Sequence, residues 1–179
     1  KTFYQTENNT LLYYISNEEK TIDWEFNTEF IYRKNMHKSH SLKLNYFLSN
    51  VDTGITNKNP NYLYNNSNSG SYSKLTYAFS NEKRDYIEYP LFGYHIHIEG
   101  SKYFKGTSPV NHFEFTGSTS HHFKLKNRLF FGSSFKGKWS SNGYQPYFSQ
   151  EGFGFDDYVR GYEYYVIDGQ DFWLTKIIL

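Results

Sequence analysis

Apolar and polar side chains alternate along residues 20–34 of this chain. The odd positions are polar or charged, apart from Ile31, and the even positions carry Ile22, Trp24, Phe26, Thr28, Phe30 and Tyr32. Because successive side chains of a strand point to opposite faces, this pattern predicts a long β-strand. One face of that strand is apolar and the other is charged, so the two faces meet different surroundings.

Shorter versions of the same pattern follow along the chain. They begin at Leu42, Leu75, Tyr94, Phe113, Phe123 and Phe172, and residues 10–15 are strand-like but apolar on both faces. We therefore expect about eight strands. Residues 36–39 and 120–122 are predicted to be short turns, whereas residues 50–71 form a long polar connection. Short turns on one side and long loops on the other are typical of an up-and-down outer-membrane barrel.

Aromatic residues are unusually frequent. The chain has 19 tyrosines and 17 phenylalanines among 179 residues, which is unlike a soluble core. A low mean hydropathy and the lack of a long apolar run exclude a transmembrane helix, but barrel strands alternate and average to a hydrophilic value. The absence of cysteine removes disulfides, thiol catalysis and thiolate metal sites. A formal charge of +1 gives no indication of a nucleic-acid partner.

The fold class that these patterns predict is all-β, a transmembrane antiparallel up-and-down β-barrel. The competing interpretation is a soluble β-sandwich, whose strands are usually about 5 to 6 residues long and pack on aliphatic cores. The predicted strands are longer and their apolar face is aromatic. Eight strands could close a small barrel, but Lys1 and Leu179 lie in mid-pattern, so we expect part of a larger one.

Two sets of polar side chains are candidates for chemistry. His95 and His97 share a strand face with Glu99, which makes a metal site geometrically possible. Three carboxylates share a face of the first long strand at a spacing that a glycosidase pair could use, namely Asp23, Glu25 and Glu29. The preferred interpretation of both sets is a polar barrel interior. His121 and His122 are expected in an exposed turn. No catalytic motif occurs, so we expect no enzyme activity, metal or cofactor.

A structured turn is predicted at residues 84–93, where proline and glycine end one strand and begin another. Residues 79–86, followed by Tyr89-Pro90 and Gly93-Tyr94, resemble the D-x-R-D-Y-x-x-Y-P-x-x-G turn of the BamA/TamA-type outer-membrane assembly-factor superfamily, also called bacterial surface antigens. Glu82 takes the place of the first aspartate. The resemblance assigns a structural role to Arg84, Asp85, Tyr89, Pro90 and Gly93.

A second string lies about 70 residues later, with three predicted strands between the two. Val159, Arg160, Gly161 and Tyr162 resemble the V-R-G-F/Y signature in the sixth extracellular loop of the same superfamily. The resemblance implies that residues 1–179 belong to a C-terminal 16-stranded barrel domain and cover roughly its fifth to twelfth strands. POTRA domains and the final strands would be absent, together with the F/G-x-D-x-G motif that supplies the usual carboxylate partner of the arginine.

The chemistry of residues 159–162 agrees with a latch inside a barrel. An arginine binds a carboxylate through two hydrogen bonds, and such a pair is stronger in a partly dehydrated space than at the surface. Gly161 permits a tight backbone path, and Tyr162 can pack against the inner wall. We expect Arg160 to hold its loop to the inside of the barrel.

The resemblance implies a bacterial outer-membrane protein that inserts or translocates other proteins. Its expected partners are outer-membrane lipids, client outer-membrane or secreted proteins, and periplasmic or lipoprotein accessory subunits, with no nucleic acid. Two alternatives stay open, the membrane barrel of a patatin-fused phospholipase and a two-partner secretion transporter. The residues that follow the signature, 163–169, depart from the most familiar insertases and leave the subfamily open.

Overall fold

The computed structural model describes residues 3–7, 10–14, 21–63, 65, 67–141, 145, 150–153 and 167–178. Within them the fold is all-β apart from one short helix. Its main element is a seven-stranded antiparallel sheet in the order β11-β8-β7-β6-β5-β4-β3. The strands are β3 (Thr21–Arg33), β4 (Lys38–Val51), β5 (Ser69–Glu82), β6 (Gly93–Lys105), β7 (Phe113–Lys126), β8 (Leu129–Ser140) and β11 (Phe172–Ile178).

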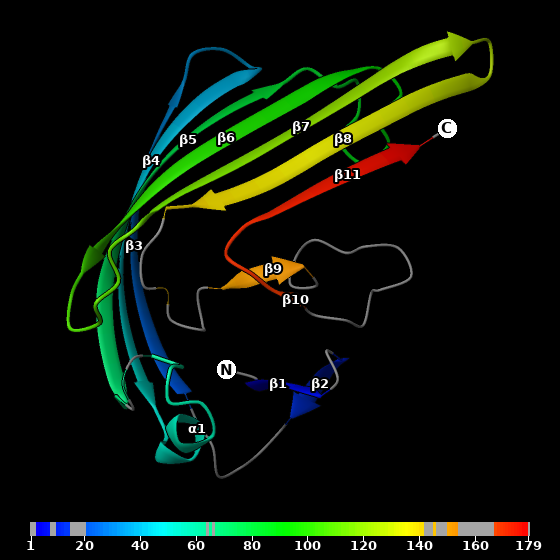
Figure 1. The fold of residues 1–179 in the computed structure, drawn as a ribbon. Helices are drawn as coiled ribbons and strands as arrows, with labels where there is room; N and C mark the ends of the chain where they lie inside the picture. The colour runs from blue at the N-terminus through cyan, green and yellow to red at the C-terminus, as the bar shows by residue number, and fades with distance from the viewer. Residues whose placement is uncertain are drawn as a thin grey trace.

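The sheet is curved and open (Figure 1). From β3 to β8 each strand pairs with its neighbours in sequence, and β11 then adds to β8. The edges of the sheet are β3 and β11. The prediction of long antiparallel strands in sequential order is therefore confirmed. The sheet itself has seven strands and does not close, so the closed barrel stays a prediction.

Two small sheets accompany the main one. β1 (Phe3–Glu7) pairs with β2 (Thr10–Tyr14), and β9 (Glu151–Phe153) pairs with β10 (Ile167–Asp168). The strand predicted at residues 10–15 thus exists, and its described partner is β1, outside the main sheet.

The connection between β4 and β5 is more ordered than the sequence predicted. It contains the helix α1 (Thr53–Lys58), and Ile55 packs with Val51 and Leu63 in a small buried cluster. Six residues are too few to set up a recognisable 3.6-residue apolar period, which is why the helix was missed. No helix among the described residues is long and apolar enough to cross a membrane.

The turn predicted at residues 120–122 is wrong. β7 continues through Ser120, which pairs with His95 on β6 and with Ser134 on β8, and the chain turns at Asn127 and Arg128 instead. Gly117 weakens a strand by propensity, and the small side chains that follow it show no apolar alternation. Pairing on both sides satisfies the backbone hydrogen bonds of this stretch, and that outweighs propensity.

The connections alternate between the two ends of the sheet. The turn end carries residues 34–37, 83–92 and 127–128, and at the loop end β4, β6 and β8 end and β5, β7 and β11 begin. The predicted contrast of length is only partial, because the turn between β5 and β6 is longer than the connection between β6 and β7.

Candidate functional site

Most of the exposed apolar side chains of the strands share one face of the main sheet, here called the apolar face, whereas Ile31 and Ile178 lie on the other face. Cross-strand partners point the same way, so Trp24 with Leu48, Leu42 with Tyr77, and Phe115 with Trp139 lie on it together. These side chains are open to the surroundings: Phe30 is 70% exposed and Trp173 is 79% exposed. A contiguous exposed apolar surface of this kind marks a region that contacts lipid, another protein or a ligand.

Aromatic residues gather near both ends of this face. All three tryptophans of the chain, Trp24, Trp139 and Trp173, lie on it within a few residues of the loop end. Near the turn end lie Tyr32, Phe79, Tyr94, Phe123 and Phe131. Between the two groups the face includes smaller or aliphatic residues, among them Thr28, Leu44, Leu75, Gly100 and Gly117. The middle also carries aromatic residues, among them Phe26, Tyr46, Tyr77 and Phe135. Lipid-facing barrel surfaces have aromatic residues at both ends of an apolar band, and this face has aromatic groups at both of its ends.

The opposite face of the sheet, here called the polar face, is the better packed of the two. Asn45, Thr76, Ser101 and Glu114 point to it from four strands, and all four are buried. The Thr76 and Ser101 hydroxyls lie 3.0 Å apart. The sheet therefore has buried polar side chains on one face and exposed apolar side chains on the other.

Charged side chains form a connected cluster on the polar face. Glu114 Oε2 lies 3.3 Å from Lys138 Nζ, and Glu114 Oε1 lies 3.6 Å from Lys74 Nζ. Lys74 Nζ is also 3.9 Å from Glu99 Oε1, and the Glu99 carboxylate accepts a hydrogen bond from Ser101. The four charges come from four different strands, so they connect β5, β6, β7 and β8 across the face.

His112 lies at the loop end beside this cluster. Its side chain is 1% exposed, and neither ring nitrogen has a hydrogen-bond partner within the described part of the chain. The ring stacks on Tyr103 with centroids 4.2 Å apart. Burial lowers the pKa of His112, the nearby lysines including Lys74 and Lys138 lower it further, and Glu114 opposes them. His112 is therefore a neutral, packed aromatic group rather than an exposed base.

The turn between β5 and β6 is held by one carboxylate. Asp85 Oδ1 accepts hydrogen bonds from the backbone amides of Tyr86, Leu91 and Phe92 at 2.9, 3.1 and 3.2 Å. The Asp85 amide in turn donates to the Phe92 carbonyl. Slight desolvation raises the pKa of Asp85, but the three amides lower it more and hold it below its ordinary value. One side chain thus closes the turn onto itself.

Gly93 and Arg84 complete the turn. Gly93 has a φ of +104°, and a Cβ there would lie 2.1 Å from the Lys83 carbonyl oxygen, so only glycine fits. Arg84 donates two hydrogen bonds to the Glu82 carboxylate, at 2.7 and 2.5 Å, and this pairing raises the arginine pKa. Tyr89 is 84% exposed and Pro90 is half-buried.

The other predicted polar residues lie on the polar face, apart from His121, which lies on the apolar face. The rings of His95 and His97 stack with centroids 6.3 Å apart, and His97 Nε2 is 3.8 Å from Glu99 Oε2. No group of three or more potential metal ligands occurs in the described part of the chain. On β3, Asp23 accepts a hydrogen bond from Ser49 and Glu25 accepts one from Asn45. His121 and His122 belong to β7 and not to a turn.

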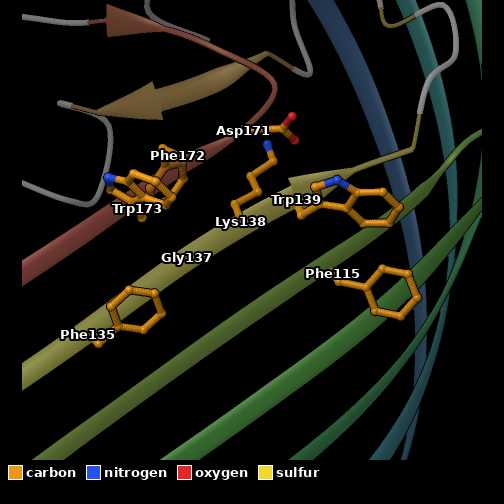
Figure 2. Close-up of a pocket in the computed structure, with 8 residues that line it drawn as sticks. All are labelled: Phe115, Phe135, Gly137, Lys138, Trp139, Asp171, Phe172 and Trp173. Carbon is orange, nitrogen blue, oxygen red and sulfur yellow. The ribbon is translucent and has the colours of Figure 1, made fainter.

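Figure 2 shows a hollow of about 620 Å³ on the sheet near the loop end. Aromatic side chains surround Gly137 there, and Phe135 and Trp139 come from the same strand as that glycine. Lys138 points away from Phe115, toward the side on which Asp171 lies. The lining residues are Phe115, Phe135, Gly137, Lys138, Trp139, Asp171, Phe172 and Trp173. Most of this lining belongs to the apolar face, whereas Lys138 and Phe172 belong to the polar face.

Sequence reasoning missed the contact between Glu114 and Lys138 and the burial of His112. Alternation alone indicated which face Glu114 occupies, but not which strands are its neighbours.

The predicted latch, Val159, Arg160, Gly161 and Tyr162, lies outside the described residues. No known protein-family model matches the chain, and no curated protein matches it either.

Proposed function

We propose that this chain forms part of a transmembrane β-barrel in a bacterial outer membrane, and that the barrel helps to insert or translocate other proteins. The observation that supports the membrane location is the exposed apolar face with aromatic groups at both ends. Lipid would cover this face, and the polar face with its ion pairs would line the interior. Outer-membrane lipids are thus the first partner.

The length of the strands supports the same proposal. β3 has 13 residues and β4 has 14. At about 3.3 Å per residue such strands are roughly 43 Å long. A tilt of about 40° leaves roughly 33 Å along the barrel axis, enough to cross a hydrocarbon layer of about 30 Å. Strands of a sandwich are shorter, and a sandwich would bury the face on which Phe30 is 70% exposed.

The transport role is supported by the resemblance described above. In the turn between β5 and β6, Asp85 accepts three backbone hydrogen bonds, and Gly93 adopts a positive φ that leaves no room for a Cβ. The resemblance extends to a 16-stranded barrel, to unfolded outer-membrane or secreted proteins as clients, and to periplasmic or lipoprotein accessory subunits. Residues 159–162 carry the second part of the resemblance, with Arg160 as the latch.

Tryptophan fluorescence tests the membrane location directly, because all three tryptophans lie on the apolar face. The protein is refolded into phosphatidylcholine vesicles whose acyl chains carry bromine at a shallow or a deep position. We expect strong quenching, greater for shallow bromine, since the tryptophans lie near one end of the face. Iodide in the water should quench little. A folded protein quenched by iodide and not by brominated lipid would contradict the proposal.

The transport role needs a functional assay. Vesicles that contain the protein are mixed with an unfolded outer-membrane barrel, and its folding is followed by gel mobility without heating. We expect faster folding than in empty vesicles. Arg160→Ala should reduce this gain and make residues 141–170 easier to cleave by protease, whereas Lys105→Ala, at an exposed cation at the end of β6, serves as the matched control. Equal folding rates with and without the protein would refute the transport role.

A further inference from the structure

The turn end of the sheet is strongly basic. The three turns and the strand residues that flank them, 33–38, 82–92 and 124–128, contain eight cationic and three anionic side chains. The cations are Arg33, Lys34, Lys38, Lys83, Arg84, Lys124, Lys126 and Arg128, and the anions are Glu82, Asp85 and Glu88. The chain as a whole has a formal charge of only +1.

The described residues of the loop-end connections carry a small net negative charge. Within 52–68, 105–112 and 141–171 the described residues include two cations, Lys58 and Lys105, and four anions, Asp52, Glu151, Asp168 and Asp171. The turn end and the described loop-end residues therefore differ in the sign of their net charge. A protein without such a separation would show similar charge on both sides of its apolar face.

Most of the cations at the turn end form no salt bridge with another described residue of the chain. Arg84 pairs with Glu82, and it is the only one of the eight that forms a salt bridge within the described chain. Lys83 lies over the ring of Tyr94 at 5.6 Å, and Lys124 lies over the ring of Phe130 at 6.0 Å. Arg33, Lys34, Lys126 and Arg128 are exposed.

Exposed apolar side chains stand among these cations. Tyr86, Ile87 and Tyr89 are 68%, 64% and 84% exposed, and Met36 in the neighbouring turn is 97% exposed. The hydrogen bonds of Asp85 hold the β5–β6 turn in shape. The two turns are joined, since the amide of Glu82 donates to the His37 carbonyl at 2.8 Å. The end of the sheet is therefore an ordered surface that mixes aromatic and basic groups.

We propose that the turn end binds the headgroup phosphates of anionic phospholipids in the leaflet that it faces. This inference rests on the proposed membrane location. If the apolar face spans the hydrocarbon layer, the aromatic residues nearest the turn end lie where the headgroups begin. The cations of all three turns then lie at the level of the headgroups. Tyrosine suits this depth because its ring is apolar and its hydroxyl is polar. Lysine and arginine close to an anionic surface each add to binding.

The arrangement fits a lipid surface better than an acidic protein segment. The cations are spread over three separate turns along the edge of the sheet, and they do not converge on one pocket. A planar layer of phosphates presents charge in the same extended way. The aromatic and aliphatic side chains between the cations can be buried in the interfacial layer of a membrane. A partner that binds through charge alone would leave these side chains in water.

A fluorescent probe next to the turns tests this proposal. The chain contains no cysteine, so Met36→Cys provides a unique attachment site at the turn end, and Asn61→Cys provides one at the loop end. The full protein is placed in nanodiscs that hold equal amounts of phosphatidylcholine and phosphatidylglycerol. In each sample one of the two lipids carries an acceptor dye on its headgroup, and energy transfer from the probe on the protein to this dye is measured. We expect transfer from position 36 to labelled phosphatidylglycerol to exceed transfer to labelled phosphatidylcholine, with no such preference at position 61.

Two double variants decide whether the basic turns cause the preference. Lys126→Gln/Arg128→Gln removes two exposed cations from the turn end and should reduce the affinity for phosphatidylglycerol about tenfold or more. Lys105→Gln/Lys176→Gln removes the same charge elsewhere and should leave it unchanged. High salt should weaken the preference. No preference at position 36, or an equal loss in both double variants, would overturn the proposal.

The same samples separate this inference from the proposed function. A protein that inserts normally into pure phosphatidylcholine, with tryptophans quenched by brominated lipid, but shows no preference for phosphatidylglycerol overturns only the headgroup site. A protein that fails to insert into any vesicle overturns the membrane location, and with it the headgroup site.

Discussion

Lys138 Nζ lies 3.3 Å from Glu114 Oε2, and each of the two side chains is only 10% exposed. The carboxylate reaches Lys74 with its other oxygen, so it connects β5 and β8 although it belongs to β7. This contact joins strands on the polar face of the sheet. Its partners are spread over 64 residues of sequence, from Lys74 to Lys138.

Loss of the Glu114 charge should destabilise the sheet. Glu114→Gln leaves two lysines close together without a carboxylate between them, and breaking a buried pair of this kind costs about 2–4 kcal/mol. The free energy of unfolding, measured by urea titration of the protein in detergent micelles or vesicles, checks this value. Glu88→Gln, in an exposed turn, should change it by less than about 0.5 kcal/mol. Similar losses for both variants would mean that the cluster contributes little.

Two glycines should respond in opposite ways to alanine. At Gly93 the positive φ and the Lys83 carbonyl leave no room for a Cβ, so Gly93→Ala should cost about 2–4 kcal/mol. At Gly117 nothing lies within 4 Å of an added Cβ, so Gly117→Ala should change stability by no more than about 0.5 kcal/mol. Urea titrations of both variants test the contrast. If Gly93→Ala were as stable as the parent protein, the described turn would be wrong.

The contribution of Asp85 should depend on pH. Its pKa in the folded protein lies below the ordinary value, so its ionised form is favoured by folding. This contribution is present above the unfolded carboxyl pKa of about 4 and is lost as pH falls through the lower folded pKa. Asp85→Ala should therefore be less stable than the parent at pH 7, with a difference that shrinks in acid. Asp85→Asn, which keeps an acceptor oxygen, is the control and should lose less.

His112 should make the protein more sensitive to acid. Burial lowers its pKa in the folded protein, so the unfolded chain takes up a proton at a higher pH than the folded one. Stability then falls as pH drops below the unfolded histidine pKa of about 6.5. His112→Phe keeps the stack on Tyr103 and should flatten this dependence between pH 7 and pH 5, measured by urea midpoints. An unchanged slope in His112→Phe would contradict this prediction.

The sequence predicted the strands well where apolar and polar residues alternate clearly. In β3 the even positions of residues 22–32 specify both the strand and its apolar side, because side-chain direction follows from backbone geometry alone. It failed where the local pattern is weak. Residues 117–122 have small polar side chains that suggest a turn, and α1 is too short to show a helical period. In both places contacts with other segments decide the conformation.

The candidate site shows the same division. His95, His97 and Glu99 were predicted to share one face, and their contacts follow from that spacing. The pairing of Glu114 with Lys138 and Lys74 depends on which strands are neighbours and on their register, and a one-residue slip of register would move these charges to the other face. Asp85 was identified by its position in a motif, but its three amide partners depend on the closed shape of the turn.

The sequence by itself determined that the chain forms long strands with one apolar and one polar side, because a two-residue period is a property of each strand alone. Only the tertiary structure decided the order of the strands, the two ends of the sheet and the position of each turn. Those features depend on pairing between segments far apart in the chain. Pairing aligned the apolar sides of seven strands into one exposed face and gathered the cations of three turns at one end.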